Sequence, residues 1–279
     1  MASILALLSS VLWGTADFLG GNLSKRFKAI AVTGASQAFG LVLGVILVLI
    51  SGSYIAPNLS WSGYFLPSVG AGIAGFFGLV SFYSGLSTGR MGVVSPISTL
   101  SAVIPLSVAF ISGERPTAIQ IFGMAVAIVG AFCASGPDIV NGLPIKPLLF
   151  GLGAALGFGV ALTLMAQGSK TSSLLTMTSM RVASVTVCIL IALRFKTISG
   201  FGISDLRILI IIGATDFVAN LLLGVATTKG LVSVAMVFGS LFPIVTVLLA
   251  FKFLHERLHK VQYLGVFLAV SGVSLISIG

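Results

Sequence analysis

The stretch His255-Glu256-Arg257-Leu258-His259 has the residue types and spacing of a zinc-dependent protease. On a helix this spacing puts both imidazoles on one face, where they can bind zinc while the glutamate acts as a general base. Zinc catalysis also needs a third ligand and an open position for water. The chain has no other histidine and no Leu-Asp-Gly element of the kind that intramembrane metalloproteases use. We therefore regard an intramembrane metalloprotease as the least favoured function of this chain. We predict no catalytic residue, no metal site and no cofactor.

The composition is typical of an integral membrane protein. Of 279 residues, 57% are hydrophobic and only 8% are charged, which is too little polar surface for a water-soluble globule of this size. We predict an all-α, multi-pass protein of the plasma membrane or bacterial inner membrane, surrounded by the lipid bilayer. Ten apolar stretches are each long enough to cross a hydrocarbon core of about 30 Å: residues 3–22, 31–52, 65–86, 93–112, 118–136, 147–168, 172–193, 208–228, 231–251 and 261–278.

Glycines spaced four residues apart indicate that these helices pack closely. Examples are Gly40 with Gly44 and Gly153 with Gly157. Small residues at this spacing let two helix backbones approach each other in a membrane. The two cysteines, Cys133 and Cys188, both lie in apolar stretches and indicate no disulfide.

Basic residues are distributed unevenly between the predicted loops. Eleven lie in loops that follow odd-numbered helices, and three lie in loops on the other side. The positive-inside rule then places the odd loops in the cytoplasm and both termini outside. The net charge of +9 thus comes from the loops of a membrane protein, and we predict no nucleic-acid partner.

The second half of the chain repeats the first. Trp13 aligns with Phe158 at an offset of 145, and each is followed by glycine. Glu114 aligns with Glu256 at an offset of 142, and each is followed by arginine. The histidine stretch therefore falls at a turn between the last two predicted helices. We interpret both glutamates as helix caps or as partners in corner ion pairs, in preference to a role in transport.

The repeats define two domains of five helices each. The polar connector at 135–147 separates residues 1–136 from residues 147–279. Because five is an odd number, the second repeat must enter the membrane from the opposite side. The predicted fold is therefore ten transmembrane helices arranged as two inverted five-helix repeats, an architecture common among secondary transporters.

Charged side chains inside the predicted helices are the strongest candidates for function. Asp17 lies four residues after Trp13, on the same helix face, and could bind a proton or a cation or instead cap a nearby loop. Asp216 has Asn220 one turn further on, and the two could contact a substrate or coupling ion or join two helices. Arg181 is the expected counter-charge of Asp216 or Asp17, unless it reaches toward the membrane surface.

Four further polar residues are candidates for a cavity wall. Gln37 lies within one position of the repeat equivalent of Arg181 and could line a cavity or bond across helices. Ser98 and Ser240 lie beside prolines that interrupt the fourth and ninth predicted helices, and interrupted helices often border a cavity. Tyr83, like Trp13, carries a polar tip that needs a partner when it is buried.

Four segments resemble the duplicated EamA domain of the drug/metabolite transporter superfamily. They are LWGTADFLGG (12–21), SGERPTAIQIFGMAVAIVGAF (112–132), GSLFPIVTVLLAFKFLHERL (239–258) and YLGVFLAVSGVSLIS (263–277). The resemblance implies a central cavity lined mainly by helices one, three and four of each repeat, a set to which Gln37 and Arg181 do not belong. It also implies cytoplasmic termini, which disagrees with the charge distribution.

The resemblance and the repeats together predict a secondary transporter and not an enzyme. We expect it to move a small metabolite, amino acid or drug-like solute by alternating access, as an exporter with protons as the candidate coupling ion. The alternative is an uncoupled facilitator or channel, whose flux would be indifferent to a pH gradient. The sequence is compatible with a monomer or a homodimer.

Overall fold

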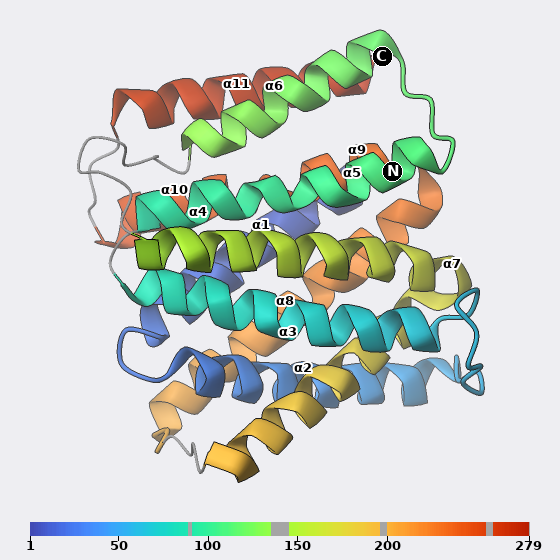
Figure 1. Cartoon of the computed structure of the whole chain (residues 1–279), viewed down its shortest axis with the longest axis vertical. Coiled ribbons are helices and arrows are strands. Elements are labelled where there is room, and N and C mark those ends of the chain that lie inside the picture. Colours follow the sequence, from blue (N-terminus) through green and yellow to red (C-terminus); the bar gives the residue numbers. More distant parts are fainter. Residues whose placement is uncertain (89–90, 135–144, 196–199, 255–258, 279) are drawn as a thin grey trace.

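The computed structural model describes residues 1–279 apart from 89–90, 135–144, 196–199, 255–258 and 279, and within these residues its regular elements are all helices joined by loops. The helices run roughly side by side, and both chain ends lie at the same end of the bundle (Figure 1). In chain order they are α1 (Ala2–Leu23), α2 (Ala29–Ser51), α3 (Phe65–Ser87), α4 (Met91–Thr99), the 3₁₀ helix η1 (Leu100–Ala102), α5 (Val103–Ile111), α6 (Ala118–Ala134), α7 (Ile145–Phe195), α8 (Ile203–Lys229), α9 (Val232–Gly239), α10 (Phe242–Leu254) and α11 (Lys260–Ile278).

Eight helical segments among the described residues are long and apolar enough to cross a membrane. One of them, α7, covers two predicted spans. Ser172 inside α7 has a non-helical backbone (φ −162°, ψ 112°), so α7 consists of a first arm before Ser172 and a second arm after it. The shorter α6, with 17 residues, coincides with a further predicted span. A multi-pass all-helical protein is therefore confirmed, while the count of ten spans stays a prediction.

The fourth and ninth predicted spans are interrupted. In the fourth span, α4 gives way to the 3₁₀ turn η1 before α5 begins, and Pro105 in the first turn of α5 lies four residues after Ser101 of η1. In the ninth, α9 ends at Gly239 and α10 begins at Phe242, directly before Pro243. Proline removes a backbone donor and crowds the preceding turn, which explains breaks at these places.

Glycines bring several helix pairs into backbone contact. A Cβ added to Gly157 of α7 would lie 2.6 Å from the Cα of Gly78 in α3. A Cβ added to Gly123 of α6 would lie 2.9 Å from the carbonyl oxygen of Gly272 in α11. Real Cβ atoms do not come so close to their neighbours, so any side chain there would push the helices apart. The predicted close packing is thus present, and α6 and α11 form one edge of the bundle (Figure 1).

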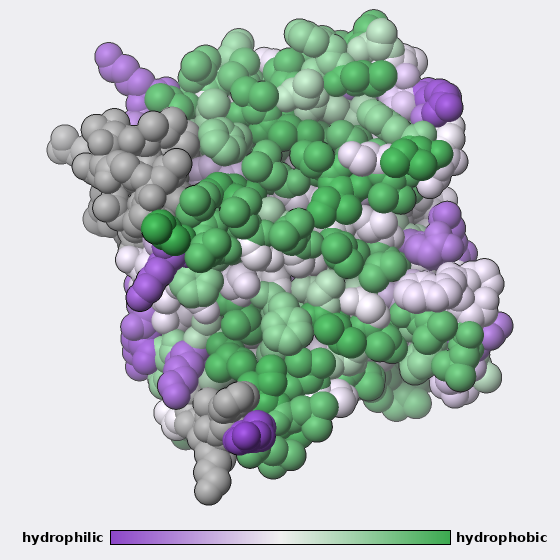
Figure 2. Space-filling model, in the orientation of Figure 1, coloured by the Kyte–Doolittle hydropathy of each residue, from purple (hydrophilic) through white to green (hydrophobic). Residues whose placement is uncertain are grey.

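Helices of the first half pack mainly on helices of the second half. The most extensive pairs are α3 with α7, α6 with α11 and α1 with α8. Large hydrophobic side chains are exposed along the flanks of many helices. On the face in Figure 2 they cover the middle, and hydrophilic side chains gather toward the helix ends. This distribution is the one expected for a bundle with its flanks in lipid.

Glu114 joins the two halves at one end of the bundle. Its two carboxylate oxygens accept hydrogen bonds from the backbone N–H groups of Val232 (2.7 Å) and Ser233 (3.0 Å). These donors belong to the first turn of α9, where a helix leaves its N–H groups unpaired and attracts negative charge. The interpretation of Glu114 as a helix cap is confirmed. Glu256 and most of the histidine stretch lie outside the described residues.

Candidate functional site

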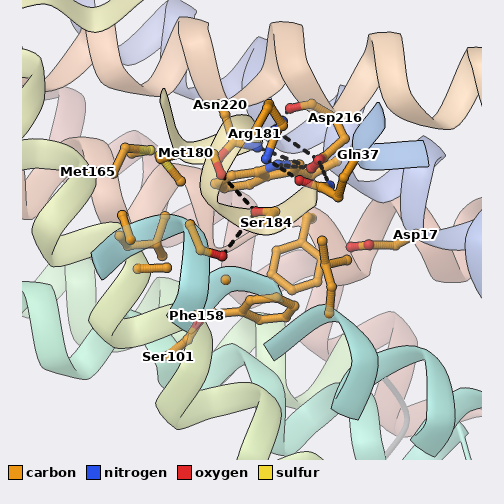
Figure 3. A pocket seen from close by; sticks show the side chains of 18 residues that line it. Asp17, Gln37, Ser101, Phe158, Met165, Met180, Arg181, Ser184, Asp216 and Asn220 are labelled. Atoms are coloured by element: carbon orange, nitrogen blue, oxygen red, sulfur yellow. Dashed lines mark hydrogen bonds and ion pairs between the residues drawn. The ribbon is translucent and has the colours of Figure 1, made fainter. Parts of the chain in front are cut away.

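A cavity lies at the centre of the bundle, between helices of both halves (Figure 3). Most of the lining is apolar, and the polar groups are few. The lining residues are Trp13, Asp17, Gln37, Ala71, Gly72, Gly75, Leu79, Ser101, Phe158, Ala161, Leu162, Met165, Met180, Arg181, Ser184, Asp216, Asn220 and Phe242.

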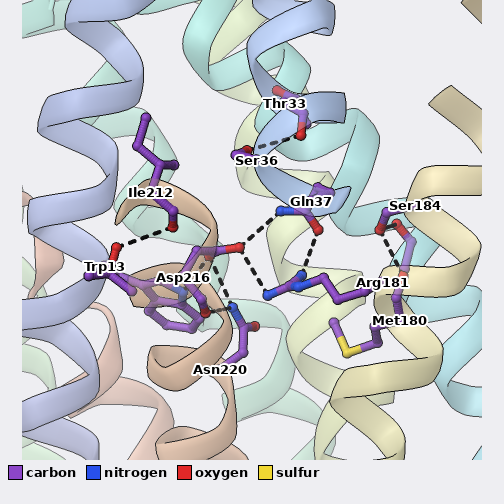
Figure 4. A network of polar contacts seen from close by, with 12 residues as sticks. Trp13, Thr33, Ser36, Gln37, Met180, Arg181, Ser184, Ile212, Asp216 and Asn220 are labelled. Carbon is purple, nitrogen blue, oxygen red and sulfur yellow. Dashed lines mark hydrogen bonds and ion pairs between the residues drawn. The ribbon is translucent and has the colours of Figure 1, made fainter. Parts of the chain in front are cut away.

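Asp216 of α8 is the centre of a polar network in this cavity (Figure 4). Its Oδ1 accepts hydrogen bonds from the indole Nε1 of Trp13 (3.1 Å) and the amide Nδ2 of Asn220 (3.1 Å). Its Oδ2 accepts one from the amide Nε2 of Gln37 (2.9 Å) and forms an ion pair with Nη2 of Arg181 (2.9 Å). Four helical segments, α1, α2, α8 and the second arm of α7, therefore meet at one carboxylate.

Arg181 is 4% exposed, so its charge must be answered inside the protein. Besides the ion pair with Asp216, its Nη1 donates to the Oε1 of Gln37 at 2.7 Å. The guanidinium carbon lies 5.9 Å from the centre of the Phe217 ring. Of the two partners predicted for Arg181, the structure pairs it with Asp216, and the guanidinium is buried in the bundle instead of reaching toward the membrane surface.

Small residues allow the helices to approach closely enough for this network. A Cβ added to Gly40 of α2 would lie 3.1 Å from the carbonyl oxygen of Gly213 in α8 and 3.2 Å from Nε of Arg181. Gly213 lies three residues before Asp216, and Gly40 three residues after Gln37, so each pair shares a helix face. The glycines therefore set the separation at which Gln37 reaches Asp216.

Asp17 lines the cavity outside this network (Figure 3). It is 7% exposed, and among the described residues its carboxyl makes no hydrogen bond or ion pair. The lining thus carries two carboxyl groups and one guanidinium. Because Asp216 already pairs with Arg181, Asp17 is the acid without a counter-charge.

The structure brings together six of the nine predicted site residues: Trp13, Asp17, Gln37, Arg181, Asp216 and Asn220. The implied set of cavity helices is too narrow, because Gln37 on α2 and Arg181 on the second arm of α7 also face the cavity. They do so because the carboxylate of Asp216 draws both side chains inward.

Three predicted site residues do not line the cavity. The hydroxyls of Ser98 and Ser240 donate to carbonyl oxygens three residues earlier, Ser95 (2.8 Å) and Val237 (2.7 Å), so they bond within their own chain segments. The ring of Tyr83 is buried against Gly20 of α1. A proline break near Ser98 and Ser240, and the polar tip of Tyr83, were therefore not sufficient to predict that these residues line the cavity.

Several lining residues were not predicted. The hydroxyl of Ser184 donates to the carbonyl oxygen of Gly72 (3.0 Å) and of Met180 (2.8 Å), which joins α7 to α3 beside the cavity. Its position three residues after Arg181, on the same helix face, was the signal that could have identified it. Phe158 could have been found as the repeat equivalent of Trp13.

A multi-pass helical bundle with a mostly apolar central cavity and a few convergent polar groups is typical of a protein that carries solutes across a membrane. The model of the EamA-like transporter family matches residues 1–136 and residues 145–278. The chain therefore belongs to the EamA-like transporter family, whose members are membrane transporters of small solutes and not enzymes.

One relative is informative about length, and one solved structure is informative about fold. An uncharacterised protein of Methanocaldococcus jannaschii is 30% identical over 134 residues, which are 47% of this chain and 96% of that protein. That relative is therefore about half as long as this chain. A solved crystal structure matches with a TM-score of 0.79 at 16% identity, over 99% of this chain and 96% of that one. This likeness concerns the fold alone.

Proposed function

We propose that this chain is a secondary transporter that exports a small metabolite, amino acid or drug-like solute by alternating access. It crosses the plasma membrane or bacterial inner membrane ten times, as two inverted five-helix repeats at residues 1–136 and 147–279. The two separate family matches and the half-length relative support the duplication. In this arrangement the two arms of α7 are separate crossings, and so is α6.

The observation that carries the proposal is the unpaired carboxyl of Asp17 beside a balanced ion pair in a central cavity. An acid in this position binds a proton when the cavity offers no other cation. Two other charged groups line the cavity, Asp216 on α8 and Arg181 on α7, and the phenol of Tyr83 on α3 is buried against α1. Asp17 is therefore the proposed site of proton coupling.

The Asp216 network supplies the part of the cavity that must rearrange. It ties α1, α2, α7 and α8 together through side chains at the level of the cavity. When a solute or a proton binds beside Asp216, the local charge changes, and so do the strengths of the hydrogen bonds and the ion pair that Asp216 forms. The helices that these contacts hold together can then shift. Rocking of the two repeats around this level would expose the cavity to one side at a time.

The test is efflux of a metabolite panel from proteoliposomes with an imposed proton gradient. Wild-type protein is expected to carry at least one solute of the panel at a rate that depends on the gradient. Asp17→Asn should remove that dependence, and Asp216→Asn should abolish transport. The matched control is Asp205→Asn, because Asp205 pairs with Arg26 (3.2 Å) at the start of α8, away from the cavity. Wild-type flux that ignores the gradient would favour the uncoupled facilitator, and gradient-dependent flux in Asp17→Asn would refute the coupling role.

A further inference from the structure

The two repeats contribute chemically different walls to the cavity. Trp13 and Asp17 of α1 have the repeat equivalents Phe158 and Leu162 in the first arm of α7, both at an offset of 145. All four line the cavity. The first repeat therefore supplies an indole N–H and a carboxyl where the second repeat supplies only hydrocarbon.

The third helices of the repeats differ in the same way. On α8 of the second repeat, Asp216 and Asn220 line the cavity. On α3, its counterpart in the first repeat, the lining residues are small or aliphatic: Ala71, Gly72, Gly75 and Leu79. Because α1 packs on α8, their polar residues gather on one wall, and the apolar wall is formed by α3 and the first arm of α7. The second arm of α7 adds Arg181 to the polar wall, and its Ser184, bonded to Gly72 of α3, lies where the two walls meet. In Figure 3 the polar network likewise lies apart from Met165 and Phe158.

Charge on the polar wall selects the sign of the ligand. Two aspartates and one arginine leave one negative charge uncompensated when both acids are ionised. The guanidinium of Arg181 is already engaged by Asp216 and Gln37. An anion would have to displace Asp216 and would also face Asp17, and like charges at short range in a poorly hydrated cavity are strongly unfavourable.

We propose that the cavity selects a small monovalent amine with an apolar body, an inference that rests on the proposed transport function. The ammonium group binds at Asp17, which has no other counter-charge. The body of the amine lies against the apolar wall of Phe158, Leu162 and Met165. A buried carboxylate without a partner is stabilised by an ammonium group that donates hydrogen bonds to it. One uncompensated charge matches one ammonium group, so a dication is disfavoured.

The experiment uses three probes that share a phenyl body and differ in the head group. Phenethylamine, 2-phenylethanol and phenylacetate are titrated into the purified full chain in detergent micelles, and binding is measured by isothermal calorimetry at neutral pH. Phenethylamine is expected to bind about tenfold or more tightly than the alcohol, since a charged hydrogen bond replaces a neutral one. Phenylacetate is expected to bind most weakly. Across butylamine, pentylamine and hexylamine, affinity should rise about three- to fourfold per methylene, because each adds contact with the apolar wall.

Variants assign the two walls separately. Asp17→Asn should reduce the affinity of phenethylamine to that of the alcohol, whereas Asp17→Glu, which keeps the carboxylate, should retain the preference for the amine. Leu162→Thr should flatten the methylene series and leave the preference for the amine intact. Asp205→Asn, outside the cavity, should bind all three probes as the wild type does.

Three results would overturn the proposal: equal or tighter binding of phenylacetate, no binding of any probe to the wild type, or a preference for the amine that survives in Asp17→Asn. The comparison of probes on the wild type decides the case even if a variant fails to fold. Failure of this inference is also separable from failure of the proposed function. If phenethylamine binds but no panel solute is carried, the transport proposal fails; if a solute without an amine is carried and phenethylamine does not bind, the amine proposal fails.

Discussion

Breaking the Arg181–Asp216 pair should destabilise the protein far more when one partner is removed than when both are. Arg181→Met leaves the Asp216 carboxylate with three N–H donors, those of Trp13, Gln37 and Asn220, and no counter-charge. Removing one partner of a buried ion pair costs about 3–5 kcal/mol. Because the donors remain, we expect the lower end, about 3 kcal/mol. Asp216→Asn leaves the guanidinium unpaired and should cost a similar amount.

The double variant removes both charges and keeps most of the network. An asparagine at position 216 can still accept from Trp13, and it can donate to Gln37 once the Gln37 amide turns its oxygen toward it. The two contacts of the Arg181 side chain, with Asp216 and with Gln37, are lost, which costs roughly 2 kcal/mol. The coupling energy between the two sites is then about 4 kcal/mol, which exceeds the range of about 0.5–3 kcal/mol that double-mutant cycles usually give for residues in contact. The assay is SDS-induced unfolding in mixed micelles, followed by far-ultraviolet circular dichroism for the wild type and all three variants.

The matched control is the same cycle on Arg26 and Asp205. This ion pair has a similar separation, 3.2 Å, but Arg26 is 65% exposed. Exposed pairs contribute about 0–1 kcal/mol, so Arg26→Met with Asp205→Asn should show little coupling. If the losses of unfolding free energy at Arg181 and Asp216 are additive, with a coupling energy no larger than in the control, the explanation is wrong. The cost of each single variant would then not come from the unpaired charge that it leaves in the cavity.

Three further predictions concern the cap of α9, the contact between α6 and α11, and the orientation of the protein in the membrane. Glu114→Gln removes the charge that caps α9 and should speed amide exchange at Val232 about fivefold, the equivalent of about 1 kcal/mol; an unchanged exchange rate would contradict the cap. Gly130→Leu should lower the unfolding temperature because the new side chain meets the backbone of Ala269, whereas Gly200→Leu, with open space around it, should not. A cysteine replacing Lys28 should react with an impermeant maleimide only after permeabilisation, and labelling of intact cells would reverse the orientation that we infer from loop charges.

The helices could be predicted from sequence because lipid enforces a simple rule. A segment in hydrocarbon must satisfy its own backbone hydrogen bonds, so length and apolarity alone identify it. The break at Ser172 was harder to predict, because apolar helical sequence begins within a few residues on both sides of it. The predicted boundary between residues 168 and 172 nevertheless falls beside it.

The charged residues of the site could be predicted because an ion inside a membrane needs an explanation. Asp17, Arg181 and Asp216 were conspicuous in apolar stretches, and charge balance predicted the pairing of Arg181. Hydroxyl groups gave no such signal. A serine can satisfy itself on the carbonyl three residues earlier, as Ser98 does, so its position on a helix does not tell whether it faces a cavity. The hydroxyl of Ser184 gave no signal either, and only its spacing of three residues from Arg181 indicated that it lines the cavity.

The glycine contact between α6 and α11 has a consequence for biosynthesis. The surface of α6 around Gly123 is shaped to fit the backbone of α11, which follows every other described helix along the chain. At synthesis rates of about 5–20 residues per second, Lys260 emerges from the ribosome roughly 6 to 25 s after Ala134. During that interval the first repeat is inserted but lacks its outermost partner. Assembly of this edge must therefore follow insertion of the second repeat, and a chain truncated before Lys260 would present the unfilled face of α6 to lipid and to membrane quality control.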